Sequence, residues 1–542
     1  MTATSFAHAV VSALLDAGLE HAVLCPGSRN APLSFALHEA CSAGLLSLHT
    51  RIDERTGGFL ALGMAKVSGR PAAVVTTSGT AAANLHPAVL EAAHAGVPLV
   101  VVTADRPASL RGTGANQTTD QVGLFGDAAV SVDVDEASEA AVPVALRGLD
   151  RAPVHLNVQF GEPLVPDVTT GQFSSYDTVS RRDDVTTARL SAPDPVTLPP
   201  GPRTVLVAGD DAGPRARLLA EAANWPLLAE PSSGSRNGEN PIRTYRLLLG
   251  TALGERIERV VVCGHPTLSR PVTRLLSRDD VEVVSVRARG RWPARPFPVA
   301  AEHDAVTVDG AGDPAWLEQW RSADRDLGAR IDALLGDEPG LTPYDVAAEV
   351  NAAIPADGLL YVGASNPIRD LDLMARAYGA GQHHKVIANR GLAGIDGTLS
   401  SAIGAALARP RTTRAIAYVG DVTFLHDLTA LVIGPGEARP DLTIVVANDD
   451  GGSIFVTLEQ GAAEHAASYD KLFGTPHGVD IGGLCTALRV SHLRVKSRDE
   501  LRHVLASPNG GLEVVEAVVR RDNRRELDAR TRALASDSTP GA

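Results

Sequence analysis

Short apolar runs alternate with amphipathic, helix-like stretches along most of the chain. The runs that we predict to be buried strands span residues 21–24, 72–76, 98–103, 154–158, 204–208, 259–263, 281–286, 359–362, 415–419, 442–447 and 511–519. Turn residues and helix-like segments, such as 5–17 and 56–68, lie between them. This repeated order of strand, turn and helix predicts an α/β protein with parallel sheets.

Two stretches interrupt this order. Residues 170–203 are polar and then Pro-rich, ending in APDPVTLPPGP, which indicates a linker. Residues 288–315 are rich in Arg, Pro and Gly and indicate a second boundary. Since 542 residues are too many for one hydrophobic core, we predict three doubly wound parallel-sheet domains at 1–175, 200–330 and 340–535. We expect the tail after about residue 534 to be disordered.

Composition narrows the classes of function. The net charge of −14 argues against general nucleic-acid binding, which needs a basic field. The longest apolar runs, such as residues 97–104, are far too short to span a membrane. Lys and Arg are absent before Arg29, so we expect no secretory signal. The four cysteines are far apart in sequence, and a cytoplasmic protein with reduced thiols is the simplest interpretation.

The stretch 420–455 places oxygen-bearing side chains after two neighbouring predicted strands. Asp421 follows the run 415–419, and Asn448 follows the run 442–447. Open α/β sheets bind ligands at the carboxyl ends of their strands, and Mg²⁺ prefers carboxylate and amide oxygens. The pair Gly451-Gly452 also lets a diphosphate approach the backbone. Two ordinary turns on either side of a helix at about 423–433 are the alternative, because Asp, Asn and Gly are common in turns.

This spacing resembles the metal and diphosphate signature of thiamine diphosphate enzymes, usually written GDG…NN. The chain departs from it at Val422, which replaces a glycine, and at Asp449, which replaces an asparagine. The resemblance implies thiamine diphosphate as cofactor, with Mg²⁺ or Mn²⁺ held by the side chains of Asp421 and Asn448 and the backbone carbonyl of Asp450. Family members of the decarboxylase type consist of a pyrimidine-binding, a central and a diphosphate-binding domain, and the three predicted domains follow that order.

Residues 45–50 lead to Glu54, and this family has a glutamate near the end of the second strand of its first domain. The resemblance implies that Glu54 hydrogen-bonds the aminopyrimidine ring and favours the tautomer that removes the thiazolium proton. From the residues alone, the cluster Arg51-Ile52-Asp53-Glu54-Arg55 is better interpreted as a set of surface ion pairs, which are common.

Eight local motifs narrow the resemblance. They are PGSRNAPL, RIDER, TTSGTAAANLHPAVLEA, TADRP, GANQTTDQ, GASNPIRDLD, ANRGLAGIDG and GGSIF. In this order they resemble the menaquinone-pathway family of 2-succinyl-5-enolpyruvyl-6-hydroxy-3-cyclohexene-1-carboxylate synthases, over most of the chain except about 170–340. The resemblance implies decarboxylation of 2-oxoglutarate and conjugate addition of the resulting carbanion to isochorismate.

Both substrates are dianions, so their site needs fixed cations, and arginine binds carboxylates in a bidentate manner. The motifs match family substrate-binding positions at Ser28, Arg29, Arg106, Gln117, Ser365, Arg369 and Arg390. Arg270 stands where the family often has lysine, and Arg274 is a rival for that position. A single arginine of this kind is most often a solvated surface residue.

The resemblance also assigns residues to the cofactor. They are Glu54, Thr80, Ser365, Ile395, Gly420, Asp421, Gly451, Ile454, Phe455 and Leu458. Ile395 matches the apolar residue that bends the cofactor, and Ile454, Phe455 and Leu458 match a dry wall that favours decarboxylation. Ordinary core packing is the alternative for Ile395.

Two other functions remain open at this point. The first is a different thiamine diphosphate carboligase or 2-oxo acid decarboxylase, such as an acetolactate synthase type, which would need fewer cations. The second is a non-catalytic relative that binds a metabolite, against which the presence of Glu54, Asp421 and Asn448 argues. The resemblance implies a homodimer at least, or a homotetramer, with the cofactor between two subunits, and small-molecule substrates as the partners.

Overall fold

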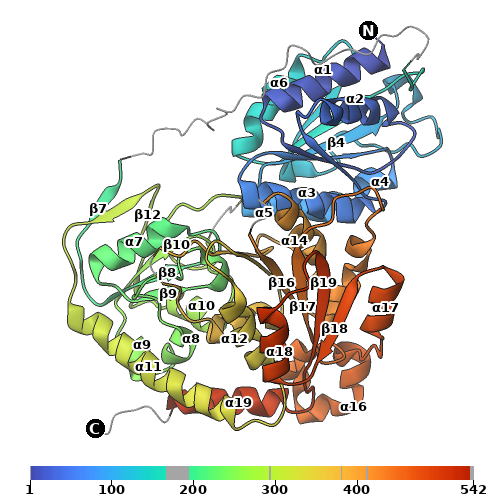
Figure 1. Cartoon of the computed structure of the whole chain (residues 1–542). Helices are drawn as coiled ribbons and strands as arrows, with labels where there is room; N and C mark the ends of the chain where they lie inside the picture. Colours follow the sequence, from blue (N-terminus) through green and yellow to red (C-terminus); the bar gives the residue numbers. More distant parts are fainter. Residues whose placement is uncertain (1, 167–193, 292–294, 380, 410–412, 537–542) are drawn as a thin grey trace.

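The computed structural model describes residues 2–166, 194–291, 295–379, 381–409 and 413–536. Its strands form three main sheets, and every strand pair in them is parallel. Helices cover the sheets, so the α/β prediction is confirmed (Figure 1).

The first sheet has six strands in the order β2-β1-β3-β4-β6-β5. Its strands are β1 (His21–Leu24), β2 (Ser47–Thr50), β3 (Ala72–Thr76), β4 (Leu99–Asp105), β5 (Val130–Val134) and β6 (Val154–Gln159). Its helices are α1 (Ala3–Asp16), α2 (Ala31–Ser42), α3 (Glu54–Ser68), α4 (Thr80–Ala83), α5 (His86–Ala95) and α6 (Ala141–Leu146).

The third sheet also has six strands, in the order β15-β14-β16-β17-β19-β18. Its strands are β14 (Leu359–Val362), β15 (Lys385–Ile387), β16 (Ala415–Gly420), β17 (Leu442–Asn448), β18 (Ser491–Val495) and β19 (Leu512–Val518). Its helices are α12 (Pro343–Ala353), α13 (Asn366–Met374), α14 (Thr398–Leu407), α15 (Asp421–His426), α16 (Ala466–Tyr469), α17 (Ile481–Ala487), α18 (Arg498–Ala506) and α19 (Arg524–Ser536). Counted from its own first strand, this order repeats that of the first sheet.

The middle sheet has five strands in the order β12-β11-β10-β8-β9. They are β8 (Thr204–Ala208), β9 (Leu227–Ala229), β10 (Arg259–Cys263), β11 (Glu282–Val286) and β12 (Ala301–His303). Its helices are α7 (Pro214–Ala223), α8 (Tyr245–Leu248), α9 (Ala252–Glu255), α10 (Arg270–Leu276) and α11 (Pro314–Gly336). A separate pair of short strands, β7 (Val196–Leu198) and β13 (Val306–Val308), lies beside it.

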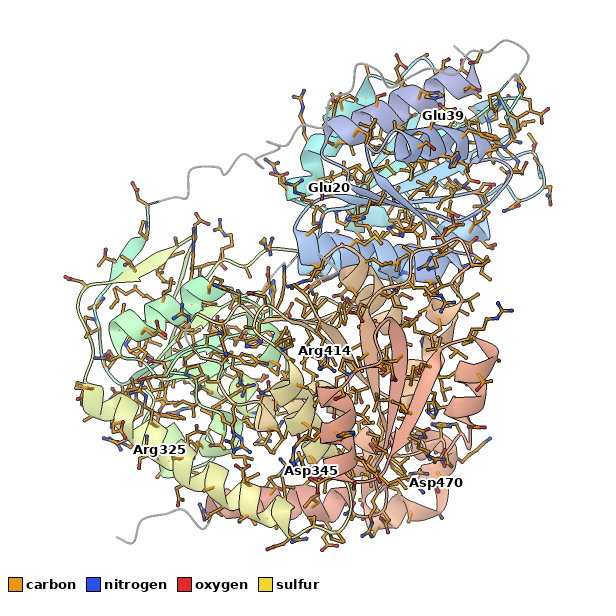
Figure 2. The ribbon with its side chains drawn as sticks, viewed as in Figure 1. Glu20, Glu39, Arg325, Asp345, Arg414 and Asp470 are labelled. Carbon is orange, nitrogen blue, oxygen red and sulfur yellow. The ribbon has the colours of Figure 1, made fainter. Side chains whose placement is uncertain are left out.

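Local sequence explains where several helices begin. At α12, where Figure 2 labels Asp345, the hydroxyl of Thr342 accepts the backbone N–H of Asp345. The Asp345 carboxylate accepts the N–H of Thr342, and both distances are 3.1 Å. This reciprocal capping box satisfies two N–H groups that the first helical turn leaves free. Asp53 caps α3 in a similar way and accepts the N–H of Arg55 at 3.0 Å. Glu54 is therefore the first residue of a helix with a fixed beginning.

Helices α3 and α14 join the first sheet to the third and lie side by side between them (Figure 1). A Cβ at Gly63 would stand 2.0 Å from the backbone oxygen of Ser401, and one at Gly404 would stand 2.1 Å from that of Leu60. Only glycine permits this approach of two backbones. One hydrophobic core accordingly contains residues of both sheets, including Val74 and Val446.

Several predicted boundaries are wrong. The helix expected at 423–433 ends at His426, and a short 3-10 helix follows at Leu428–Leu431. The predicted linker 170–203 contains β7, and the predicted boundary 288–315 contains β12 and β13. The tail expected to be disordered begins inside α19, which continues to Ser536. Residues 167–193 and 537–542 lie outside the described part of the chain.

Two further findings concern the whole chain. No helix among the described residues is both long and apolar enough to cross a membrane. All four cysteines are free thiols, of which Cys25, Cys263 and Cys485 are buried.

Candidate active site

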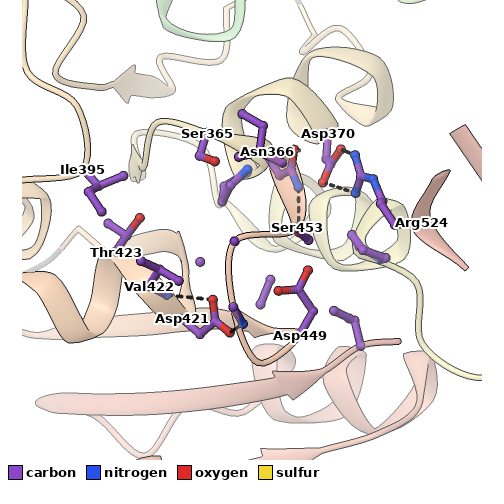
Figure 3. A pocket seen from close by; sticks show the side chains of 18 of the residues that line it. Ser365, Asn366, Asp370, Ile395, Asp421, Val422, Thr423, Asp449, Ser453 and Arg524 are labelled. Carbon is purple, nitrogen blue, oxygen red and sulfur yellow. Dashed lines mark hydrogen bonds and ion pairs between the residues drawn. The ribbon is translucent and has the colours of Figure 1, made fainter. Parts of the chain in front are cut away.

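Two turns meet at the carboxyl ends of β16 and β17. The Asp421 carboxylate accepts the N–H of Gly451 at 2.9 Å through one oxygen and the N–H of Val422 at 2.7 Å through the other. Figure 3 shows Asp421 beside the loop that carries Asp449. The two turns are therefore held together by hydrogen bonds as well as by the pairing of their strands.

Asn448 and Asp450 belong to the second of these turns. The side-chain oxygen of Asn448 accepts the N–H of Asp450 at 3.0 Å, and its amide nitrogen donates to Glu516 at 2.7 Å. Asp450 has a φ of +58°, a left-handed conformation that costs a non-glycine residue about 1 kcal/mol or more. Asp421, Asn448 and Asp450 thus lie within one hydrogen-bonded unit, although Asn448 and Asp450 do not line the cavity described below.

His477 is a neighbour of this unit that the sequence did not reveal. Its Nε2 lies 3.2 Å from the Asp421 carboxylate, and its Nδ1 lies 3.4 Å from the Asp450 carboxylate. Its backbone N–H also donates to Asp450 at 3.1 Å. No motif singles His477 out, because it comes from a loop well downstream in the chain.

The carboxyl groups of Asp421, which is buried, and of Asp449, which is half-buried, resist ionisation. Burial raises the pKa of Asp421 above its ordinary value, and hydrogen bonds from Gly451 and Val422 offset part of that shift. Burial raises the pKa of Asp449 to about 7, and the Asp421 charge adds to the shift. A cation at this point would favour the ionised form of both groups.

A cavity opens beside these turns and encloses about 680 Å³, open solvent included. Seven predicted cofactor residues line it: Ser365, Ile395, Gly420, Asp421, Gly451, Ile454 and Phe455. Residues that the sequence analysis did not assign to the cofactor also line it, including Asn366, Asp370, Asp449, Ser453 and Arg524 (Figure 3). Leu458, predicted for the cofactor, lines the neighbouring chamber instead.

Arg524 and Asp370 form a buried ion pair at the edge of the cavity. The two guanidinium nitrogens of Arg524 donate to the two carboxylate oxygens of Asp370 at 2.5 and 2.9 Å. Their side chains are 4% and 1% exposed, so each charge depends on the other to offset its loss of hydration.

Asn366 donates to the hydroxyl of Ser453 at 2.9 Å, which joins α13 to the loop after β17.

An arginine-lined chamber adjoins the first cavity and shares Asn366, Ile454 and Arg524 with it. Its arginines are the predicted Arg270 and Arg369, the rival Arg274, and in addition Arg246, Arg524 and Arg532. Burial lowers the pKa of Arg369, and the positive charges of Arg390 and Arg246 lower it further. Such a cluster of like charges favours an anionic ligand.

The predicted arginines differ in their surroundings. Arg390 donates to the hydroxyl of Thr267 at 2.8 Å, and Arg369 donates to the backbone oxygen of Ser365 at 2.6 Å. Ser365 has a φ of +71°, again a left-handed conformation. Arg270 is mostly exposed and pairs with Glu459 at 3.0 Å.

A second group of predicted residues gathers on the first sheet. Arg106 donates to the hydroxyl of Ser78 at 2.7 Å and to the backbone oxygen of Gln117 at 3.0 Å. Gln117 has a φ of +56°. Arg29 donates to the backbone oxygen of Phe160 at 3.0 Å, and burial followed by the charge of Arg106 lowers its pKa.

The two groups do not share a cavity within one chain. Ser28 and Thr80 are exposed, and Glu54 is half-buried at the beginning of α3. Of the described residues that line the two cavities, none comes from the first sheet. Within the described chain, the predicted site residues therefore fall into two groups that line no common cavity.

Comparisons with known proteins agree with this geometry. Residues 4–124 match the family model of the thiamine pyrophosphate enzyme N-terminal TPP binding domain, and residues 371–515 match that of the C-terminal TPP binding domain. A 2-succinyl-5-enolpyruvyl-6-hydroxy-3-cyclohexene-1-carboxylate synthase of a Nocardioides strain is 63% identical, over 98% of each chain. Synthases of the same name from Kineococcus radiotolerans and an Arthrobacter strain are 49% and 44% identical, over 96% and 99% of this chain and 97% and 93% of their own.

Proposed function

This chain belongs to the 2-succinyl-5-enolpyruvyl-6-hydroxy-3-cyclohexene-1-carboxylate synthase family, and from that premise we propose how its residues divide the work. It is a thiamine diphosphate-dependent transferase of menaquinone biosynthesis. The reaction is the decarboxylation of 2-oxoglutarate and the addition of the resulting carbanion to isochorismate. The observation that carries the assignment of residues is the position of the acidic turns beside the arginine-lined chamber.

The residues at the ends of β16 and β17 fit a diphosphate and its divalent cation. A Cβ at Gly451 would stand 2.1 Å from the backbone oxygen of Gly474, so the backbone here is closely packed on that side, and Gly451 also lines the cavity. The side chains of Asp421 and Asn448 and the backbone carbonyl of Asp450 are hard oxygen donors, which suit Mg²⁺ or Mn²⁺. We assign the metal to these three groups and the diphosphate to Gly420 and Gly451.

Thiamine diphosphate supplies the electron sink that makes loss of CO₂ possible. The apolar side chains of Ile454, Phe455 and Leu458 would exclude water from the reacting carbon, where a dry environment disfavours the charged carboxylate. Ile395 lies in the lining of the same cavity and would support the bent shape of the cofactor. Ser365, held at a strained φ of +71°, would contact both cofactor and substrate.

Arginines would bind the carboxylates of the two substrates. The third sheet's part of the chain would contribute Arg369, which lines the arginine-lined chamber, and Arg390, which lies next to it. The middle sheet's part would contribute Arg270, which also lines the chamber. Ser28, Arg29, Arg106 and Gln117 would do so from the first sheet. Hydrogen bonds among Arg106, Ser78 and Gln117 fix the orientation of Arg106 and Gln117.

We propose that a second copy of the chain completes each site. Glu54, Thr80 and the substrate residues of the first sheet line neither cavity of their own chain, so a homodimer is the smallest complete enzyme and a homotetramer is a larger alternative. Three α/β domains at 1–175, 200–330 and 340–535 and a cytoplasmic location belong to the same proposal.

The decisive experiment measures CO₂ release from 2-oxoglutarate with thiamine diphosphate and Mg²⁺, with and without isochorismate. Consumption of isochorismate in step with CO₂ supports the assignment. Release of CO₂ while isochorismate stays constant would favour another carboligase or decarboxylase, and no release would favour a non-catalytic relative.

A complementation experiment tests the shared site. A homodimer of Glu54→Gln chains and a homodimer of Arg369→Ala chains should each be inactive, because every site in them carries one substitution. When they are mixed and allowed to exchange subunits, a mixed dimer contains one site free of both substitutions, so activity returns. Mixtures that stay inactive would place both residues in the site of one chain.

A further inference from the structure

The carboxylate of Glu91, on α5, lies against the backbone of a segment from the third sheet. One oxygen accepts the N–H of Gly391 at 2.9 Å, and the other accepts the N–H groups of Leu392 at 2.6 Å and Ala393 at 2.8 Å. Glu91 is completely buried. Three consecutive amides from one part of the fold therefore converge on a single side chain from another.

The hydrogen bonds account for the buried charge. No Lys or Arg in the described part of the chain forms an ion pair with Glu91, so the three N–H donors stabilise it. A carboxylate has acceptor sites for all three donors, whereas a glutamine amide presents N–H groups on one side. The position is therefore suited to glutamate rather than to a neutral polar residue.

The segment held by Glu91 carries two proposed site residues. It lies between β15 and α14 and includes Arg390 and Ile395. A Cβ at Gly391 would stand 2.7 Å from the backbone oxygen of Glu91, so the segment rests directly on α5. Lys66 of α3 donates to the backbone oxygen of Ala388 and lies 3.6 Å from Asp210 of the middle sheet. The segment is thus attached to other parts of the fold at both sides of Arg390.

A matching arrangement holds the loop that leads to Glu54. The Glu437 carboxylate, from the third sheet's part of the chain, accepts the N–H of Thr50 at 2.9 Å at the end of β2. Thr429 donates to Asp53 at 2.8 Å. In both halves, the loop after the second strand of one sheet is held by a glutamate from the other half, as the shared strand order allows.

We propose that Glu91 is a positioning residue for the synthase reaction: its carboxylate fixes the backbone at Gly391 to Ala393 so that Arg390 and Ile395 face substrate and cofactor. The inference rests on the proposed assignment of Arg390 and Ile395. It predicts that loss of the carboxylate changes substrate affinity and local backbone protection, beyond any loss of overall stability.

The experiment compares full-length Glu91→Gln, Glu91→Asp and Glu91→Ala dimers with wild type. Glu513→Gln is the matched control, because Glu513 is equally buried and accepts hydrogen bonds from Thr443 and Asn509, away from both cavities. The readouts are KM and kcat for both substrates and hydrogen exchange of the peptide that covers 388–398. We expect Glu91→Gln to raise KM about tenfold, the loss of one hydrogen bond to a charged group, and to speed exchange at 391–393.

The conservative variant Glu91→Asp distinguishes a positioning role of Glu91 from a role in overall stability alone. Glu91→Asp keeps the charge but is one methylene shorter, so it should recover part of both the KM and the exchange protection. Unchanged KM and exchange in Glu91→Gln would overturn the proposal. So would a lower melting temperature with normal KM, because Glu91 would then only hold the fold together. If wild type itself fails to consume isochorismate, the proposed function fails, whereas the exchange data still report what Glu91 does to the segment.

Discussion

The Asp421 carboxylate accepts the backbone N–H of Gly451 at 2.9 Å, across the ends of two neighbouring strands. This bond joins the residue assigned to the metal with the residue assigned to the diphosphate. The carboxylate has further lone pairs, so it remains able to bind a cation while it holds the turn. The shape of the cofactor site is therefore built into the pairing of β16 and β17.

Gly451→Ala should abolish cofactor binding. The residue has a φ of +144°, and an added Cβ would stand 2.1 Å from the backbone oxygen of Gly474, so the turn would have to move. Isothermal titration of the apo protein with thiamine diphosphate and Mg²⁺ measures the loss. Gly436→Ala is the control, because nothing lies within 4 Å of a Cβ at that position. Normal binding by Gly451→Ala would move the diphosphate elsewhere.

Glu54→Gln should fold and bind cofactor but lose most of its activity. A positioned acid or base contributes about 10²- to 10⁴-fold to a rate, so kcat should fall by that factor. The Asp53 carboxylate caps α3 by accepting the N–H of Arg55, and this bond does not involve the Glu54 side chain, so α3 should be unchanged. Turnover at the wild-type rate would remove Glu54 from the mechanism.

Arg390→Ala should raise KM for the anionic substrates much more than it disturbs folding. A hydrogen bond to a charged group is worth about 1.5–3 kcal/mol, equivalent to about 10- to 150-fold in KM. Steady-state kinetics and a thermal melt of the same sample test both parts. Arg325→Ala is a suitable control, because Arg325 lies on α11 and its pair with Glu318 is well exposed (Figure 2). An unfolded Arg390→Ala protein would show that the side chain is structural.

Arg524→Ala should lower the free energy of unfolding by about 3–5 kcal/mol. It leaves the Asp370 carboxylate, 1% exposed, without its partner. The double variant Arg524→Met with Asp370→Leu should lose less than either single variant, because no charge is then left alone. Denaturant titrations of the wild type, the two single variants and the double variant give the coupling free energy between Arg524 and Asp370. A cost below about 1 kcal/mol for Arg524→Ala would be that of an exposed pair and would contradict the buried one.

Glu230 should make the protein less stable in alkaline solution. Burial raises the pKa of Glu230 from 4.5 to about 8, although the charge of Arg390 opposes the shift. The stability that this group contributes is complete below about pH 4.5 and is lost as the pH rises through about 8. The difference amounts to roughly 5 kcal/mol at most.

Glu230→Gln tests this relation, because it resembles the protonated acid and still accepts the N–H of Leu268. Its stability relative to wild type should therefore increase between pH 5 and pH 9, as measured by denaturant titration. Glu258→Gln should not show this gain, since Arg203 lowers the pKa of the exposed Glu258. Parallel pH profiles of Glu230→Gln and wild type would show that Glu230 stays ionised.

Much of the fold follows from apolar runs, and the strands that were missed are either very short or partly polar. The run 72–76 is buried at every position and matches β3. Strands β5 and β18 were not predicted, because half of their residues are polar or charged and only Val134 and Val495 are buried. The predicted helix 423–433 breaks at Asp427, whose carboxylate accepts the N–H of Ser400 at 2.7 Å instead of allowing the helix to continue.

The candidate site divides in a similar way. Residues within one motif, such as Asp421 and Gly451, could be predicted because their spacing fixes their place at strand ends. His477 and Arg524 come from loops and helices with no motif of their own, and only the folded chain brings them to Asp421 and Asp370. The position of Glu91 could not be predicted either, since its partners are backbone amides, which every sequence contains.

The common strand order of the first and third sheets has a consequence for protein engineering. Two halves with one topology look interchangeable, and the part that forms the first sheet is an obvious unit to replace with that of a relative. Such an exchange would replace Glu91 and Lys66 but would leave their partners Gly391 and Ala388, and the close contact at Ser401, unchanged. A working chimera would have to exchange the segment 388–404 together with the first sheet. The exchanged first sheet would then keep the segment that it contacts in its own protein.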